Sequence, residues 1–268
     1  LVEEGLLKSE ELDSVQWYWE ENRVDFGIQY NNRLNMLRKA FARFQPGEAY
    51  EAFCAENSSW LPDFALFMAL KGKFNGQPWY SWEEPLKFRQ PNAIWAARQE
   101  LKDEIAFFSF VQYLFFRQWN ALHAYAKQNN ITIIGDVPIY VPRDSVETWS
   151  NPEQFQLDEQ LDPVAVAGCP PDAFSADGQL WGNPLYRWDV LANDSYAWWI
   201  NRLAAAGKLY DVVRMDHFRG FAGYWSVPFG DPTAVNGQWM KGPGIDFINA
   251  VKKQLPELKL LVDSVQAS

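Results

Sequence analysis

The sequence predicts an α/β chain, in which a mainly helical first half precedes a second half of alternating strands and helices. Two observations predict this class. Apolar residues recur at helical spacing from residue 1 to about residue 130, and compact β-branched or apolar runs separated by helical segments follow. Strands that alternate with helices form parallel sheets, so we expect an open doubly wound sheet or part of a closed barrel. In both, functional groups gather at the carboxyl ends of the strands.

The first half shows helical spacing in two long segments. One apolar face combines Leu34, Leu37, Ala40, Phe41 and Phe44, and a second amphipathic pattern runs from Leu101 to Tyr125. Helix-breaking residues separate the segments at Pro46-Gly47, at Gly76-Gln77-Pro78 and at Pro85. We therefore expect residues 1–130 to be helical and the strands to begin at about residue 131.

The second half begins with ITIIGDVPIYV (131–141), which predicts a buried strand with a turn near Gly135. A long stretch rich in Pro, Gly and Asp runs to about Arg187 and is expected to be irregular. A helical segment to Ala206, an apolar strand over 209–215, a further loop, a helix over 245–254 and a strand over 258–262 follow.

Composition excludes several functional classes. The 268 residues are 48% hydrophobic and carry a net charge of −10, which disfavours binding to nucleic acid and to anionic membrane surfaces. The most apolar stretch, 106–116, is too short to cross a bilayer. Cys54 and Cys169 lie far apart, and the first residues are acidic, so we expect a cytoplasmic protein without disulfides. Because the chain starts at Leu1, we also expect a fragment.

Aromatic residues make up 16% of the chain, including 14 tryptophans. Most are expected in the core, and the remainder would suit the flat apolar faces of sugar rings. Two histidines, His123 and His217, are too few for a histidine-rich metal site, so no metal site is predicted. We expect His123 to be an ordinary surface or core-edge residue.

The strongest candidate site lies at the end of the predicted strand, taken as residues 211–216. A period of two places Val212, Arg214 and Asp216 on one face and Val213 and Met215 on the other. The Arg214 guanidinium would then favour the ionised form of the Asp216 carboxylate, which suits a nucleophile or an electrostatic stabiliser. The alternative is a structural ion pair at a strand end. His217 follows, where it would bind a substrate hydroxyl or cap the turn.

A second carboxylate, Asp263, follows the next predicted strand. Two carboxylates on adjacent strand ends form a plausible acid/base and nucleophile pair for acetal chemistry, although acidic residues often follow strands by chance.

Several long motifs resemble the amylomaltases, the 4-α-glucanotransferases or disproportionating enzymes of the α-amylase-like barrel superfamily. They are AGCPPDAFSADGQLWGNPLYRW (167–188) and VRMDHFRG (213–220), supported by GDVPIYV (135–141), YLFFRQW (113–119) and PTAVNG (232–237). The resemblance covers nearly the whole chain. It implies that residues 131–268 are part of a (β/α)8 TIM-type barrel that carries the nucleophile strand. Residues 1–130 would then form a mainly helical inserted subdomain with barrel-flanking helices.

The resemblance also implies an activity. These enzymes move α-1,4-glucan segments between maltooligosaccharides by a retaining double displacement, without a metal or organic cofactor. Carried over by motif, Asp216 resembles the nucleophile, Arg214 the residue that keeps it ionised, and His217 a contact to the sugar beside the cleaved bond. The loop with Asp172 and Phe174 resembles a mobile cover of the acceptor sites, and Gln179 and Trp181 resemble further glucan contacts.

This chain departs from the family in two respects. Where the family has Ala-Glu-Asp, with the Glu as general acid/base, the sequence reads Val262-Asp263-Ser264. Asp263 would withdraw the carboxyl group by about 1.5 Å, where about 0.5 Å is tolerated. Family members are also longer, and their later part supplies a third essential carboxylate. We therefore expect a central fragment of a glucanotransferase. The alternatives are a catalytically inactive glucan-binding remnant and, less favoured by the acceptor-loop motif, a glucan hydrolase.

Overall fold

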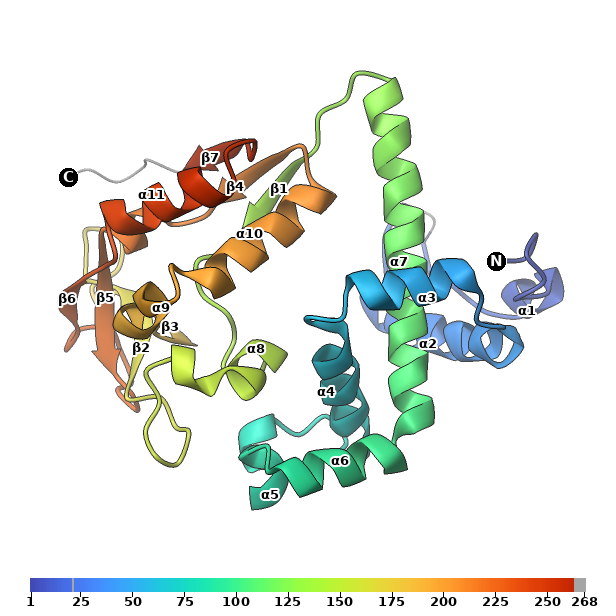
Figure 1. The fold of residues 1–268 in the computed structure, drawn as a ribbon, viewed down its shortest axis with the longest axis horizontal. Helices are drawn as coiled ribbons and strands as arrows, with labels where there is room; N and C mark the ends of the chain where they lie inside the picture. Colours follow the sequence, from blue (N-terminus) through green and yellow to red (C-terminus); the bar gives the residue numbers. More distant parts are fainter. Residues whose placement is uncertain (21, 263–268) are drawn as a thin grey trace. The chain divides into compact units, whose positions relative to one another are not determined.

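The computed structural model describes residues 1–20 and 22–262, and the chain divides into two compact units (Figure 1). The first unit comprises Leu1–Asn75 and Ile94–Arg117, and the second comprises Gly76–Ala93 and Gln118–Ser268. The strands of the described residues lie in the second unit. The predicted α/β class is therefore confirmed.

Helices dominate the first unit, as the apolar spacing predicts. They are α1 (Ser9–Asp13), α2 (Phe26–Arg43), α3 (Glu48–Glu56), α4 (Leu61–Lys73), most of α6 (Pro91–Glu100) and the first part of α7 (Lys102–Gln128). Asp25 caps α2, because its Oδ1 accepts the backbone N–H of Ile28 at 2.9 Å. Ala40 of the predicted face of α2 is buried against Phe110 of α7, together with Met36, which the predicted face does not include. Among the described residues, no helix is both long and apolar enough to cross a bilayer.

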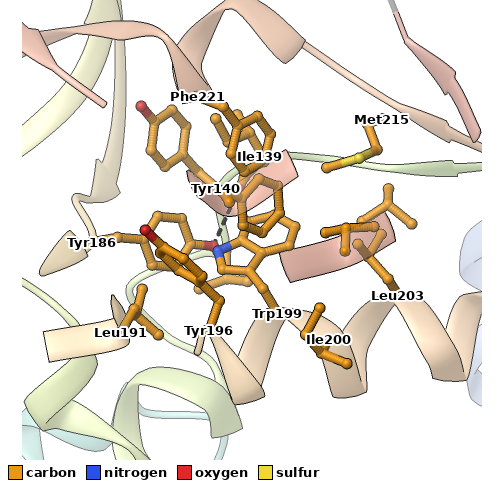
Figure 2. Close-up of a cluster of buried hydrophobic side chains, with 14 of the residues drawn as sticks. Ile139, Tyr140, Tyr186, Leu191, Tyr196, Trp199, Ile200, Leu203, Met215 and Phe221 are labelled. Atoms are coloured by element: carbon orange, nitrogen blue, oxygen red, sulfur yellow. Dashed lines mark hydrogen bonds between the residues drawn. The ribbon is translucent and has the colours of Figure 1, made fainter. Parts of the chain in front are cut away.

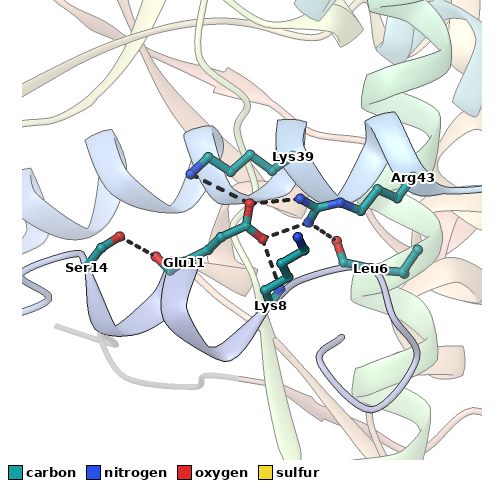
Figure 3. Close-up of polar contacts among 6 residues, drawn as sticks. All are labelled: Leu6, Lys8, Glu11, Ser14, Lys39 and Arg43. Atoms are coloured by element: carbon teal, nitrogen blue, oxygen red, sulfur yellow. Dashed lines mark hydrogen bonds and ion pairs between the residues drawn. The ribbon is translucent and has the colours of Figure 1, made fainter.

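A two-pronged ion pair joins α1 to α2 (Figure 3). Arg43 Nη1 and Nη2 donate to Glu11 Oε2 and Oε1 at 2.7 and 2.8 Å. The hydrogen bonds from Arg43, followed by one from the backbone N–H of Lys8, lower the pKa of Glu11 to about 2. Arg43 also donates to the carbonyl oxygen of Leu6 at 3.0 Å, so one guanidinium orders the start of the chain.

The second unit contains two sheets. A parallel sheet has the order β1 (Ile134–Val137), β4 (Val212–Met215), β7 (Leu260–Val262), and an antiparallel sheet has the order β3 (Gln179–Pro184), β2 (Ala165–Cys169), β5 (Gly223–Pro228), β6 (Gln238–Lys241). The helices are η1 (Trp79–Ser81), α5 (Glu84–Lys87), the last part of α7, α8 (Val146–Ser150), η2 (Pro152–Gln154), α9 (Trp188–Asn193), α10 (Ala197–Leu209), η3 (Phe218–Phe221) and α11 (Ile245–Gln254).

The parallel sheet packs on helix α10 through an aromatic core. Val213 and Met215 of β4 are buried, as the period of two predicts, and Trp199 and Leu203 of α10 are buried in the same cluster (Figure 2). The two outer strands expose apolar side chains: Ile134 of β1 is 58% exposed and Leu261 of β7 is 47% exposed. The core therefore covers one face of the sheet and leaves the outer strands partly bare.

The prediction for residues 131–141 is wrong in two details. Gly135 does not form a turn; it lies within β1 and pairs with Val213. A Cβ on Gly135 would lie 1.9 Å from the Tyr210 ring, so the glycine allows this ring to approach the strand. The strand is shorter than predicted and only half buried, with Asp136 exposed between buried neighbours. It ends before Pro138, which has no N–H to donate to a sheet.

The antiparallel sheet is not predicted from the sequence, in which residues 142–187 and the loop after β4 are expected to be irregular. Strand β2 (AVAGC) consists mostly of small residues, and β3 contains Gly182 and Pro184. Neither has the β-branched alternation that indicates a strand. Strand β3 pairs with β2, and β2 also pairs with β5, which is distant in sequence, as in Val166 opposite Val227.

Candidate active site

An arginine and two carboxylates meet at the carboxyl ends of β1 and β4. Arg214 Nη1 lies 2.6 Å from Asp136 Oδ1, and Arg214 Nη2 lies 2.9 Å from Asp216 Oδ1. Asp136 and Arg214 are direct partners in the parallel register, and Asp216 follows on the same face as Arg214. The predicted pairing of Arg214 with Asp216 is confirmed. One guanidinium therefore holds two negative charges side by side while the Asp216 side chain stays 44% exposed.

The backbone fixes the place of Asp216. Its N–H donates to the carbonyl oxygen of Val137 at 3.1 Å, which extends the contact of β4 with β1 by one residue. The next residue, His217, has a φ of 50° and turns the chain into η3. This left-handed conformation is uncommon for residues other than glycine. The tight turn ends the strand directly after Asp216 and brings His217 to the same end of the sheet.

Aromatic rings lie beside His217. The Trp181 ring meets the His217 ring edge to face, with centroids 4.9 Å apart, and lies 6.2 Å from the Tyr140 ring. Burial raises the pKa of Tyr140 well above its usual value, so its phenol stays neutral. Gln179 Oε1 accepts the Trp181 indole N–H at 3.1 Å. The structure thus brings His217 beside Trp181 of β3, a strand that lies far from His217 in the sequence and also carries Gln179.

The turn between β2 and β3 carries the remaining predicted contacts, Asp172 and Phe174. Asp172 Oδ1 accepts the backbone N–H groups of Phe174 and Ser175, each at 2.8 Å. Ser175 Oγ donates to the carbonyl oxygen of Gly178 at 2.7 Å, which tightens the turn further. Phe174 itself is 100% exposed. The hydrogen bonds within the turn therefore hold an apolar ring in water. Such a ring is available to contact a ligand.

Asp263 lies outside the described residues, so the prediction that it serves as acid/base stays untested. Asp136 is absent from the predicted site, although it lies in β1 as the register partner of Arg214 in β4. The signal in the sequence is an acidic residue inside the mostly apolar run 131–141. Its importance depends on the pairing of β1 with β4, which is a tertiary property.

His123 fits its predicted structural role. It lies in α7, is only 9% exposed, and its Nε2 lies 3.0 Å from Asp211 Oδ1. This contact ties α7 to the start of β4, at the opposite end of the strand from Asp216.

A separate pocket of about 490 Å³ lies in the second unit. Its lining combines aromatic and polar side chains: Gln156, Leu157, Val164, Tyr186, Arg187, Trp188, Asp189, Tyr224 and Lys241. None of the predicted site residues lines this pocket. The candidate active site is therefore a surface at the strand ends and is distinct from this pocket.

Comparison with known proteins identifies the family. Residues 1–264 match the family model described as 4-alpha-glucanotransferase. The chain is 42% identical over 268 residues to a 4-alpha-glucanotransferase of Clostridium butyricum and 45% identical over 271 residues to one of Thermus thermophilus. These alignments include 99% of this chain but 55% and 53% of the relatives. The chain thus spans about half the length of the curated relatives it matches.

Two solved structures have a fold similar to that of this chain. The structure of amylomaltase from Streptococcus agalactiae in complex with acarbose matches all of this chain and 55% of its own, with a TM-score of 0.94 and 36% identity. Amylomaltase from Corynebacterium glutamicum shares the fold over 89% of this chain and 32% of its own, with a TM-score of 0.71 and 18% identity.

Proposed function

Because the chain belongs to the 4-alpha-glucanotransferase family, we propose that it carries the nucleophile side of an active site that transfers α-1,4-glucan segments between maltooligosaccharides. The observation that carries the proposal is the Arg214 guanidinium between Asp136 and Asp216 at the strand ends. A structural ion pair needs one carboxylate. Here two are gathered on the exposed end of a parallel sheet, where barrel enzymes place their catalytic groups.

Asp216 is the proposed nucleophile. One of its carboxylate oxygens attacks the anomeric carbon of the donor glucan, forms a glycosyl ester and displaces the 4-oxygen of the leaving sugar. Arg214 holds Asp216 Oδ1 at 2.9 Å and leaves the other oxygen for the attack. Asp136 holds the other arm of the same guanidinium and so orients it.

Asp263 is the proposed acid/base. As an acid it protonates the leaving 4-oxygen, and as a base it takes the proton from the 4-hydroxyl of the acceptor that attacks the glycosyl ester. Its carboxyl group is about 1.5 Å shorter in reach than that of a glutamate. We therefore expect slow transfer, limited by proton delivery.

Substrate contacts come from the turn and from β3. Trp181 and His217 form a corner of two rings that suits one face and one hydroxyl of a sugar, and Gln179 fixes the indole. Asp172 and Phe174 lie on the turn proposed to cover the acceptor. An apolar cover slows the attack of water on the glycosyl ester, so transfer prevails over hydrolysis. The amylomaltase of known structure was solved in complex with acarbose, which makes acarbose a suitable binding probe.

The same family supports a proposal for the architecture. Residues 131–268, with the parallel strands β1, β4 and β7, form part of a (β/α)8 barrel, and residues 1–130 form the mainly helical inserted subdomain with barrel-flanking helices. The partners are α-1,4-glucans and not nucleic acid or membranes, and we place the activity in the cytoplasm.

The test is incubation of the chain with maltotriose, with glucose and longer maltodextrins followed by mass spectrometry. Transfer gives glucose together with a ladder of longer glucans, and the Asp216→Asn variant gives neither. Glucose and maltose without a ladder would indicate a hydrolase. Acarbose or maltotriose binding without any product would favour the inactive glucan-binding alternative.

A further inference from the structure

A second loop supports the turn that carries Asp172 and Phe174. The backbone N–H of Ala234 donates to the carbonyl oxygen of Asp177, within that turn, at 3.0 Å. Ala234 is itself fully buried and packs with Val166 of β2 and Val227 of β5. The turn is therefore anchored near its end to a residue that packs against the antiparallel sheet.

Trp225 holds Ala234 from the other side. Its indole Nε1–H donates to the carbonyl oxygen of Ala234 at 2.9 Å. Gly237 makes room for this ring, because a Cβ at that position would lie 2.1 Å from the Trp225 indole nitrogen. The Trp239 ring packs against the Trp225 ring edge to face, with centroids 5.4 Å apart. The indole is thus fixed by one hydrogen bond and by contacts with two neighbours.

The two hydrogen bonds share one residue, Ala234, which accepts one through its carbonyl oxygen and donates the other through its N–H. The Trp225 indole donates to the Ala234 carbonyl, and the Ala234 N–H donates to Asp177. Trp225 also pairs with Gly168 of β2, the strand that leads into the turn. The side chain of this tryptophan therefore acts on the end of the turn, and its backbone acts on the entry. Sites supported by rigid strands are held more accurately than sites on free loops.

We propose that Trp225 is a positioning residue, which sets the place of the turn over residues 170–178 through Ala234 and thereby the affinity for the acceptor sugar. The acceptor part of this inference rests on the proposed function. Trp225 does not reach the reacting atoms; it acts through the backbone that presents Asp172 and Phe174.

The first test is hydrogen exchange followed by mass spectrometry on the whole chain, comparing Trp225→Phe with Trp95→Phe. The first variant removes the N–H donor and keeps an aromatic ring. The second makes the same change at an exposed tryptophan on α6, in the first unit. We expect Trp225→Phe to speed exchange over residues 172–178 by about 2- to 10-fold, as for the loss of one hydrogen bond. Exchange of the β4 amides in this variant, and exchange over residues 172–178 in Trp95→Phe, should be unchanged.

Gly237→Ala tests the same hydrogen bond, from Trp225 to Ala234, by a different change. Its Cβ displaces the indole without changing Trp225, and we expect faster exchange over residues 172–178 here as well. Unchanged exchange in the turn of Trp225→Phe would overturn the proposal. Equal acceleration across β2, β4 and β5 would also overturn it, because that result describes general destabilisation.

The second test separates binding from chemistry. With maltotriose as donor and glucose as acceptor, Trp225→Phe should raise the acceptor KM by about 2- to 10-fold and leave kcat within about twofold. A fall in kcat at constant acceptor KM would contradict the proposed role. Absence of transfer by the unmodified chain would mean that the proposed function fails, and the exchange data would still decide whether Trp225 positions the turn.

Discussion

Asp136 and Arg214 lie opposite each other on two parallel strands and are joined by a contact of 2.6 Å between Oδ1 and Nη1. The second arm of the same guanidinium reaches Asp216 at 2.9 Å. The arginine therefore spans two strand ends, and its rigid fork sets the distance between two carboxylates. A lysine has one ammonium group on a flexible stem and cannot hold this geometry.

Arg214→Lys is expected to lower the rate of glucan transfer by about 10- to 100-fold, because the Asp216 carboxylate loses its oriented partner. Initial rates of glucose release from maltotriose measure the effect. Arg187→Lys is the matched control, since Arg187 has only a loose contact of 3.8 Å with the exposed Asp189. Equal rates in the two variants would refute the role of Arg214.

Asp263→Glu is expected to accelerate transfer, because the added methylene returns the carboxyl group to the reach of the family's acid/base. Single-turnover rates with maltotriose show the gain, which should be largest for donors with poor leaving groups. Asp263→Asn keeps the size of the side chain and removes proton transfer, so it should abolish the activity. If Asp263→Glu is no faster than the unmodified chain, Asp263 is not the acid/base.

Phe174→Ser is expected to raise the ratio of hydrolysis to transfer, because water reaches the glycosyl ester more easily without the apolar ring. The ring is fully exposed, so the change should leave thermal stability almost unaltered. Released glucose compared with the ladder of longer glucans gives the ratio. Tyr125→Ser, an exposed aromatic residue on α7, should leave the ratio unchanged. A constant ratio in Phe174→Ser would exclude the covering role.

Asp211 links the end of α7 to the start of β4 and predicts a pH dependence of stability. Its Oδ2 accepts the backbone N–H of Ile133 at 2.9 Å, and its Oδ1 lies 3.0 Å from His123 Nε2 and 3.3 Å from Lys127 Nζ. The hydrogen bond from Ile133, followed by those from His123 and Lys127, lowers the pKa of Asp211 from 3.8 to about 2. Because the pKa is lower in the folded state, the carboxylate stabilises the fold above about pH 4. This contribution disappears as the pH falls towards 2.

Asp211→Asn should therefore lower Tm at pH 7, and the difference from the unmodified chain should shrink between pH 4 and pH 2. Thermal unfolding followed by circular dichroism at several pH values provides the measurement. Asp189→Asn removes an exposed carboxylate and should have little effect on Tm at any pH. A Tm difference for Asp211→Asn that stays constant down to pH 2 would contradict this account.

The features that could be predicted from the sequence depend on local patterns. The alternation of Val213 and Met215 with Arg214 and Asp216 follows from the period of a single strand, and the strand itself is apolar enough to stand out. The helical face of α2 follows from the same kind of periodicity. The family motif predicts the site contacts of Gln179 and Trp181, and the structure adds the approach of Trp181 to His217 and its hydrogen bond to Gln179.

The features that could not be predicted depend on partners distant in sequence. Strands β2 and β6 are short; β2 forms by pairing with β3 and β5, and β6 by pairing with β5. Asp136 gains its place in the site because β1 pairs with β4 at a particular register. The hydrogen bond of Trp225 to Ala234 joins a strand to a loop nine residues later, and no periodic pattern indicates it.

The exposed side chains on β1 and β7 have a practical consequence. Over the described residues, both outer strands of the parallel sheet present backbone groups beside apolar side chains such as Ile134 and Leu261. Such edges are templates on which another chain can add a strand. Preparations of the isolated polypeptide should therefore self-associate as concentration rises. Leu261→Lys should keep them monodisperse, because the added charges on two copies would repel each other.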